Sequence, residues 1–262
     1  MKRNKEMRGA PANTFNVNMP VVDVAPPAEE PQPAEEPKRR QLIVVDLETT
    51  GLHDDAAILE VAAVNLDTGA TLHFVPHVTP EALSKAEPEA LKLNRYYERG
   101  VFEQALTSKE TSDKYRELRD MLRGNVFAGS NPTFDSGLLA RVKVQRQMPA
   151  WTFALNPPVA VPDDYVTPFG RPWHHRLADL AVYAAGKLDI DLDDLPGLDA
   201  VAELMGVPVL VERHTAVGDA ALTATLFEIL RSMGAGAGWT AQGHLLADLH
   251  ALHAGLRTER VL

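Results

Sequence analysis

Two carboxylates at the end of an apolar run are the first residues in this chain whose spacing suggests chemistry. Ile43, Val44 and Val45 form a β-branched stretch that is typical of a buried strand, and Asp46 and Glu48 follow it. Residues i and i+2 of a strand point to the same face, so two negative charges are expected side by side. A divalent cation such as Mg²⁺ or Mn²⁺ would relieve their repulsion, because these ions prefer carboxylate oxygens. A strand that ends in a solvated acidic turn is the alternative, and the short D-x-E motif alone favours it.

A second acid is expected at the start of a helix. In the stretch N-P-T-F-D, Pro132 suits the first helical turn and Asn131 is a plausible N-cap. Asp135 then lies in the first turn, where the helix dipole favours a carboxylate. This helix is expected to carry Arg141, Lys143 and Arg146 as well. Taken alone, Asp135 would be a common helix-start acid.

A third stretch, H-T-A-V-G-D, joins a histidine to another acid. His214 and Asp219 are five residues apart, which would place them on different sides of a regular helix. We therefore expect His214 in a loop that leans over the helix start, with Thr215 as the N-cap. Each of the two residues, taken alone, also fits an ordinary structural role.

Four carboxylates and one histidine match the requirements of two-metal phosphodiester hydrolysis. In that chemistry one ion lowers the pKa of a water and directs it at phosphorus, and a second ion, about 3.5–4 Å away, stabilises the leaving oxygen. A histidine with a pKa near neutrality can accept the proton of the water.

The stretches D-L-E-T-T-G-L, N-P-T-F-D and H-T-A-V-G-D resemble, in order and spacing, the three motifs of the DEDD (DnaQ-like) 3′→5′ exonucleases. The histidine places the resemblance in the DEDDh branch, a group with polymerase proofreading subunits and RNase T. It covers roughly Gln41 to Arg231. The resemblance implies an α/β, ribonuclease H-like fold with a mixed five-stranded sheet flanked by helices.

The resemblance also implies roles for individual residues. His214 would be the general base, and the backbone at Thr49 would meet the terminal 3′ hydroxyl. Leu52 would wedge against the last base, and Phe134 would line that pocket. Asp179 would be a structural residue at a helix start. Two Mg²⁺ or Mn²⁺ ions would be held by Asp46, Glu48, Asp135 and Asp219.

Composition divides the chain into three parts. Residues 1–40 are rich in proline, alanine and glutamate, which predicts a disordered tail. Residues 41–232 contain the three motifs and are predicted to form the exonuclease domain. The last part, 233–262, begins with a glycine-rich joint and continues into a predicted amphipathic helix over 245–256. A proline-rich loop is expected over 149–172.

Bulk properties limit the function further. The chain has no cysteine, which excludes disulfides and cysteine-based metal sites and fits a cytoplasmic protein. No apolar run approaches the roughly 20 residues that a membrane span needs. The formal net charge of -10 argues against a protein that coats nucleic acid electrostatically, but not against one that holds a chain end through bound metal.

The leading hypothesis is a metal-dependent 3′→5′ exonuclease that releases nucleoside monophosphates from single-stranded DNA, in DNA replication or repair. An RNA-trimming exonuclease or oligoribonuclease of the same fold is the alternative, because recognition of the 2′-hydroxyl depends on few contacts. A non-catalytic interaction module is a third possibility, which the loss of one of the five residues would have favoured. Proofreading would require a partner such as a DNA polymerase or another replication protein, since no polymerase domain is present.

Overall fold

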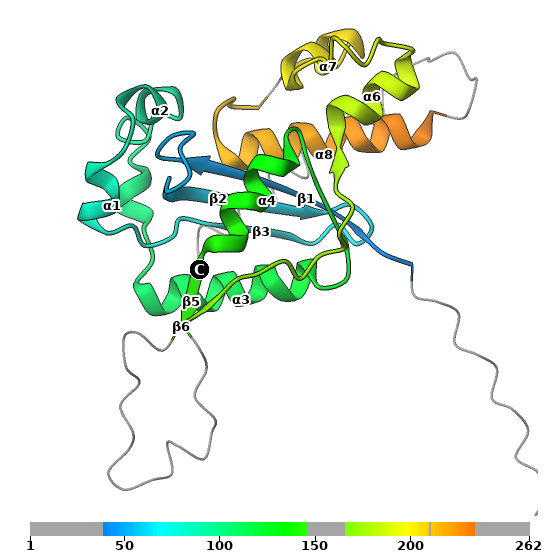
Figure 1. The fold of residues 1–262 in the computed structure, drawn as a ribbon. Coiled ribbons are helices and arrows are strands. Elements are labelled where there is room, and N and C mark those ends of the chain that lie inside the picture. Colours follow the sequence, from blue (N-terminus) through cyan, green and yellow to red (C-terminus); the bar gives the residue numbers. More distant parts are fainter. Residues whose placement is uncertain (1–38, 146–165, 210, 234–262) are drawn as a thin grey trace, which may run out of the picture. The chain divides into compact units, whose positions relative to one another are not determined.

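A five-stranded sheet is the centre of the structure (Figure 1), which is a computed structural model that describes residues 39–145, 166–209 and 211–233. These residues belong to one compact unit that begins at Arg39. The strand order is β3-β2-β1-β4-β7. The strands are β1 (Leu42–Thr49), β2 (Ile58–Asn65), β3 (Thr71–Phe74), β4 (Val126–Gly129) and β7 (Ala178–Asp179).

The sheet is mixed, as predicted. β2 is antiparallel to both β1 and β3, whereas β4 is parallel to β1 and β7. All eight residues of β2 are buried, which fits its largely apolar sequence, although Glu60 and Asn65 are buried with the rest. The register between β1 and β2 shifts between Glu48 and Thr49, so pairing becomes irregular where the predicted acidic motif ends.

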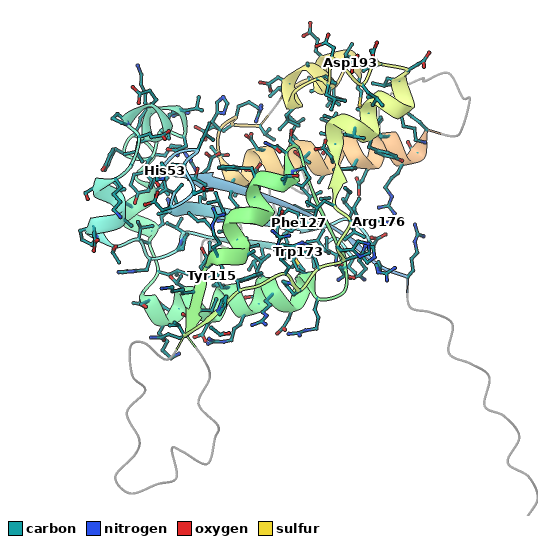
Figure 2. The ribbon with its side chains drawn as sticks, viewed as in Figure 1. His53, Tyr115, Phe127, Trp173, Arg176 and Asp193 are labelled. Atoms are coloured by element: carbon teal, nitrogen blue, oxygen red, sulfur yellow. The ribbon has the colours of Figure 1, made fainter. Side chains whose placement is uncertain are left out.

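Alternate residues of β1 enter two hydrophobic cores on opposite faces of the sheet. Val44 joins the core built around α8 (Ala216–Ser232). Ile43, Val45 and Leu47 join the core that includes α3 (Ser108–Leu122) and α4 (Pro132–Arg141). Because Asp46 and Glu48 follow Val44 at spacings of two, strand alternation directs them to the face covered by α8. Figure 2 labels Tyr115, Phe127 and Trp173, which belong to the other core.

Two groups of shorter helices frame these layers. The first comprises α1 (Pro80–Ser84), α2 (Pro88–Leu93) and η1 (Val101–Gln104), and a small third core includes Leu59, Val75, Tyr96 and Val101. The second comprises α6 (Leu180–Leu188) and α7 (Leu198–Leu204), both of which contact α8. Asp179 is the N-cap of α6, in agreement with the structural role expected for it. No helix in the described ranges is long and apolar enough to cross a membrane.

One helix prediction was wrong. The helix that begins at Pro132 ends at Arg141, and Lys143 belongs instead to strand β5 (Lys143–Gln145). β5 pairs antiparallel with β6 (Val166–Pro168), and buried Val144 packs into the α3–α4 core. The pairing of β5 with β6 thus prevails over the expected continuation of helix α4. Arg146, the tail up to residue 38, most of the expected 149–172 loop and the predicted 245–256 helix lie outside the described residues.

The start of α8 makes a close backbone contact that can be tested. A Cβ added at Gly218 would lie 2.0 Å from the carbonyl oxygen of Glu212. Gly218→Ala must therefore displace the loop that carries His214, and we expect it to lower the free energy of unfolding by about 1–3 kcal/mol, as overpacking does. Urea denaturation measures this change.

Gly186→Ala is the matched control, because Gly186 lies in α6 and an added Cβ would meet nothing within 4 Å. Helix propensity predicts that this control is neutral or stabilising by up to about 1 kcal/mol. Equal stability of the two variants would show that the loop before α8 is not held against Gly218.

Candidate active site

The structure brings three of the predicted acids into one cluster. Asp46 and Glu48 lie on β1, and Asp219 lies in the first turn of α8. One carboxylate oxygen from each of these three residues lies within 4.8 Å of the others. This juxtaposition follows from the alternation along β1, which directs both strand acids toward α8.

Asp135 approaches the same strand end from the opposite layer. It lies in the first turn of α4, is buried, and its Oδ1 accepts a hydrogen bond of 3.0 Å from the backbone N–H of Leu47. Leu47 is the residue between the two strand acids, so the hydrogen bond fixes Asp135 beside them. Its negative charge also raises the pKa of Asp46.

The electrostatics of the acids favour a cation. Burial, together with the charges of Asp135 and Glu48, raises the pKa of Asp46 well above its usual range. Burial and the nearby charge of Glu60 raise the pKa of Glu48 to about 8, and burial raises that of Asp135 to about 7. Carboxylates that resist ionisation without a partner are suited to a hard divalent ion, which their oxygens ligate well. The donor set therefore fits Mg²⁺ or Mn²⁺.

Arg213 supplies part of the missing positive charge. Its guanidinium donates to the carboxylates of Asp219 and Asp199 and lowers the pKa of both Asp46 and Glu48. Nothing in the sequence distinguished Arg213 from other surface arginines. Arg213 directly precedes His214 in the sequence, but its contact with the carboxylate of Asp219 is evident only in the fold.

His214 lies in the loop before α8, as predicted, and is partly buried. Its φ of 57° is in the left-handed region, which non-glycine residues adopt infrequently. Thr215 is the N-cap of α8, and its hydroxyl both accepts from the Gly218 N–H and donates to the carbonyl oxygen of Glu212 at 2.9 Å. Glu212 in turn forms an ion pair with Arg95. The loop is therefore fixed on both sides of the histidine.

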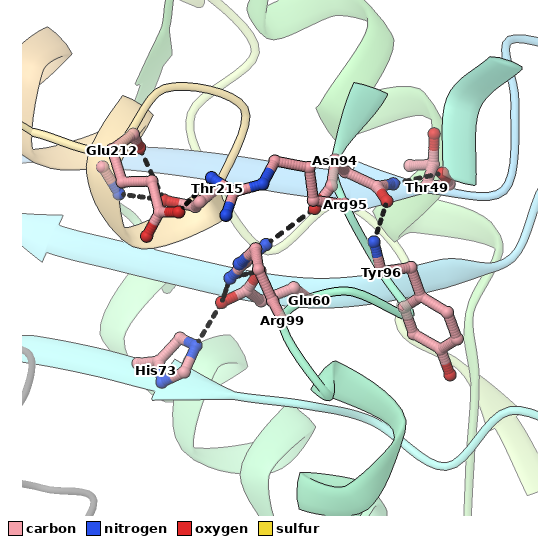
Figure 3. A network of polar contacts seen from close by, with 10 residues as sticks. Thr49, Glu60, His73, Asn94, Arg95, Tyr96, Arg99, Glu212 and Thr215 are labelled. Atoms are coloured by element: carbon pink, nitrogen blue, oxygen red, sulfur yellow. Dashed lines mark hydrogen bonds and ion pairs between the residues drawn. The ribbon is translucent and has the colours of Figure 1, made fainter. Parts of the chain in front are cut away.

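A second layer of polar contacts lies behind the cluster (Figure 3). Glu60 is 1% exposed and pairs in register with Glu48 across the β1–β2 ladder. Burial alone would raise its pKa, but hydrogen bonds from His73 at 2.8 Å and Arg99 at 2.9 Å, with their charges, hold the pKa below its usual value. A lone carboxylate in the apolar stretch I-L-E-V-A-A-V was the signal that sequence reasoning passed over.

The same layer reaches the backbone of Thr49. Arg99 donates to the carbonyl oxygen of Asn94 at 3.0 Å, and the Asn94 amide donates to the carbonyl oxygen of Thr49 at 3.2 Å. Thr49 is buried, and its hydroxyl donates to the carbonyl oxygen of Gly51 at 2.8 Å. Neither Asn94 nor Arg99 belongs to one of the three motifs, so sequence reasoning missed both.

The other two residues predicted to contact substrate differ in their surroundings. Leu52 follows the acidic motif and is 80% exposed, which leaves its side chain available for contact. Phe134 is partly buried and packs against the α3–α4 core. The substrate roles of both residues stay predictions.

The raised pKa values predict a specific pH dependence of stability. Between the ordinary carboxylate range and about pH 8 the folded protein binds more protons than the unfolded one, so its stability falls as the pH rises. With a chelator present, we expect the melting temperature to fall from pH 5 to pH 8, and to fall less in Glu48→Gln. Mn²⁺ should raise the melting temperature most at high pH, where its ligands are ionised.

Asp193→Asn, an exposed change outside the cluster, should leave this profile unaltered. With chelator present, the stability of the wild-type protein could instead stay constant or rise from pH 5 to pH 8, in parallel with that of Glu48→Gln. That result would contradict the assignment of raised pKa values to these acids.

Comparisons with known proteins also indicate a nuclease. A sequence model of the exonuclease family RNase T matches residues 43–227. A structure of E. coli exonuclease I in complex with a dT13 oligonucleotide superposes with a TM-score of 0.51 at 17% identity, covering 74% of this chain and 41% of that chain. A second exonuclease I structure gives a TM-score of 0.51 at 16% identity, with coverage of 85% and 44%.

The chain thus spans about two fifths of the length of these exonuclease I structures, and at such identities the likeness establishes the fold alone. No curated protein matches the sequence. The family match covers most of the chain, including all three motifs. The chain therefore belongs to the RNase T exonuclease family.

Proposed function

We propose that this exonuclease removes nucleoside monophosphates from the 3′ end of single-stranded DNA by a two-metal mechanism with a histidine base. The observation that carries the proposal is the cluster of Asp46, Glu48 and Asp219, with Asp135 fixed beside it. Three of these acids, Asp46, Glu48 and Asp135, have raised pKa values and little evident structural use, and together with Asp219 they are a suitable ligand set for two divalent ions.

Each residue has a distinct part in this proposal. Asp46, Glu48, Asp135 and Asp219 would hold two Mg²⁺ or Mn²⁺ ions, which, when bound, activate the attacking water and offset the charge on the leaving oxygen. His214 would accept the proton of the water. The Thr49 backbone, held by Asn94, would orient the terminal 3′ hydroxyl, while Leu52 and Phe134 would contact the last base.

Single-stranded DNA is the proposed substrate because exonuclease I, a similar fold, is seen in complex with dT13. Trimming of RNA is the alternative, since the described residues of the site do not determine the sugar. Degradation of end-labelled DNA and RNA strands of one sequence, with Mg²⁺ or Mn²⁺ and with a chelator, separates the two. Any role in proofreading would require a polymerase or other replication protein as partner.

Asp46→Asn keeps the shape of the side chain but removes a metal-ligating charge. We expect its rate of 3′-end shortening to fall to the background measured with chelator, because one ion loses a ligand that the other acids cannot replace. The exposed variant Asp193→Asn should shorten the strand at the wild-type rate. Near-normal turnover by Asp46→Asn would exclude the cluster as the catalytic centre.

His214→Gln separates proton transfer from metal binding. We expect a loss of about 10²–10⁴-fold in turnover, as for a missing general base, with Mn²⁺ affinity within about twofold of wild type by calorimetry. A comparable loss of Mn²⁺ affinity would instead identify the histidine as a ligand. Unchanged turnover would exclude it from both roles.

A further inference from the structure

Two exposed aromatic side chains lie on the segment between α2 and the end of η1. Tyr97 is 58% exposed and Phe102 is 44% exposed, although soluble proteins usually bury most of such side chains. Their ring centroids are 5.8 Å apart with an interplanar angle of 55°. We propose that this aromatic pair binds unpaired nucleobases of the substrate strand upstream of the nucleotide that is removed. The inference rests on the proposed function and extends it to the length of strand that is recognised.

The aromatic pair is built on a fixed base. Tyr96 is buried in the small core with Val75 and Val101, and its ring contacts Tyr97 at 5.2 Å and Phe102 at 6.1 Å between centroids. The Tyr96 N–H donates to the Asn94 side chain at 3.1 Å. A surface held in this way loses little conformational freedom when a base stacks on it, which favours binding.

The segment that carries the aromatic pair is also fastened to the candidate active site. Asn94 donates to the Thr49 carbonyl oxygen, Arg95 pairs with Glu212 in the loop before His214, and Arg99 pairs with Glu60 behind Glu48 (Figure 3). Tyr97 is three residues from Asn94, so their Cα atoms are at most about 11 Å apart. Tyr97 therefore lies within the length of a few nucleotides of a 3′ end held at Thr49, close enough for the strand to reach it.

Charge favours bases over phosphates as the occupant. Glu98 and Glu103 flank the two aromatic residues in the sequence, and both arginines of the segment, Arg95 and Arg99, are already paired with carboxylates. A surface that gripped phosphates would be expected to be basic. Aromatic rings instead stack on bases with little regard to sequence, and stacking is worth about 1–3 kcal/mol per base. Stacked bases inside a duplex do not offer their faces, so the pair would select single strands.

Binding of 5′-labelled oligothymidylates of 2 and 12 nucleotides tests the proposal by fluorescence anisotropy. The measurement uses Asp46→Asn with Mg²⁺, so that the strand is not shortened. Adding Tyr97→Ser and Phe102→Ser should weaken binding of the 12-mer about tenfold or more and leave the dinucleotide within about twofold. Tyr97→Trp should retain the affinity for the 12-mer. Leu192→Ser, a change at a leucine that is 64% exposed elsewhere on the chain, is the matched control and should bind both like the parent.

Unchanged binding of the 12-mer by the double variant would overturn the proposal, as would equal weakening for both lengths, which would place the pair in the cleavage pocket. A shift in oligomeric state, measured by light scattering, with unchanged DNA binding would identify a protein contact instead. Failure of the proposed function would give a different result. The wild-type protein would then shorten no strand, while binding would still depend on strand length.

Discussion

Repulsion among the carboxylates at one end of β1 must be offset by the sheet and helices that surround them. Asp46 and Glu48 share a face of the strand, Asp219 meets them from α8, and Asp135 is fixed to the backbone between them. Burial and the charges of neighbouring acids raise the pKa of Asp46 and of Glu48, so the arrangement costs stability whenever it is ionised without a counter-charge. The sheet and both helix starts hold these groups together against that cost, which is typical of a functional site.

The counter-charges present in the chain lie around the cluster and balance it only in part. Arg213 reaches Asp219, while Arg99 is engaged by Glu60 directly across the ladder from Glu48. Because Glu60 keeps its charge through His73 and Arg99, it adds to the negative potential at Glu48 as well as positioning Arg99. This second layer links the acids to Asn94, Thr49 and the aromatic pair. The site is thus a connected unit of strand, helix starts and the α2–η1 segment.

Residues with local signals could be predicted from the sequence, whereas residues placed by tertiary contacts could not. Three local signals predicted the structure at their own positions, and the structure has them as expected. They are the apolar run before Asp46, Pro132 at a helix start and Thr215 as an N-cap. The prediction that Lys143 continues helix α4 was wrong, because the pairing of Lys143 with β6 depends on residues more than twenty positions away. Arg213 and Arg99 were missed for the same reason, whereas Glu60 had a local signal, a lone carboxylate in an apolar run. Their significance lies in what the fold places beside them.

A crystal structure of the protein grown with Mn²⁺ would show whether the four acids hold two divalent ions. Anomalous scattering locates Mn²⁺ without reference to activity. We expect two ions about 3.5–4 Å apart, with ligands from Asp46, Glu48, Asp135 and Asp219 and with Arg213 withdrawn from Asp219. A fully soaked crystal in which Arg213 still pairs with Asp219 and no ion lies among these acids would contradict this expectation.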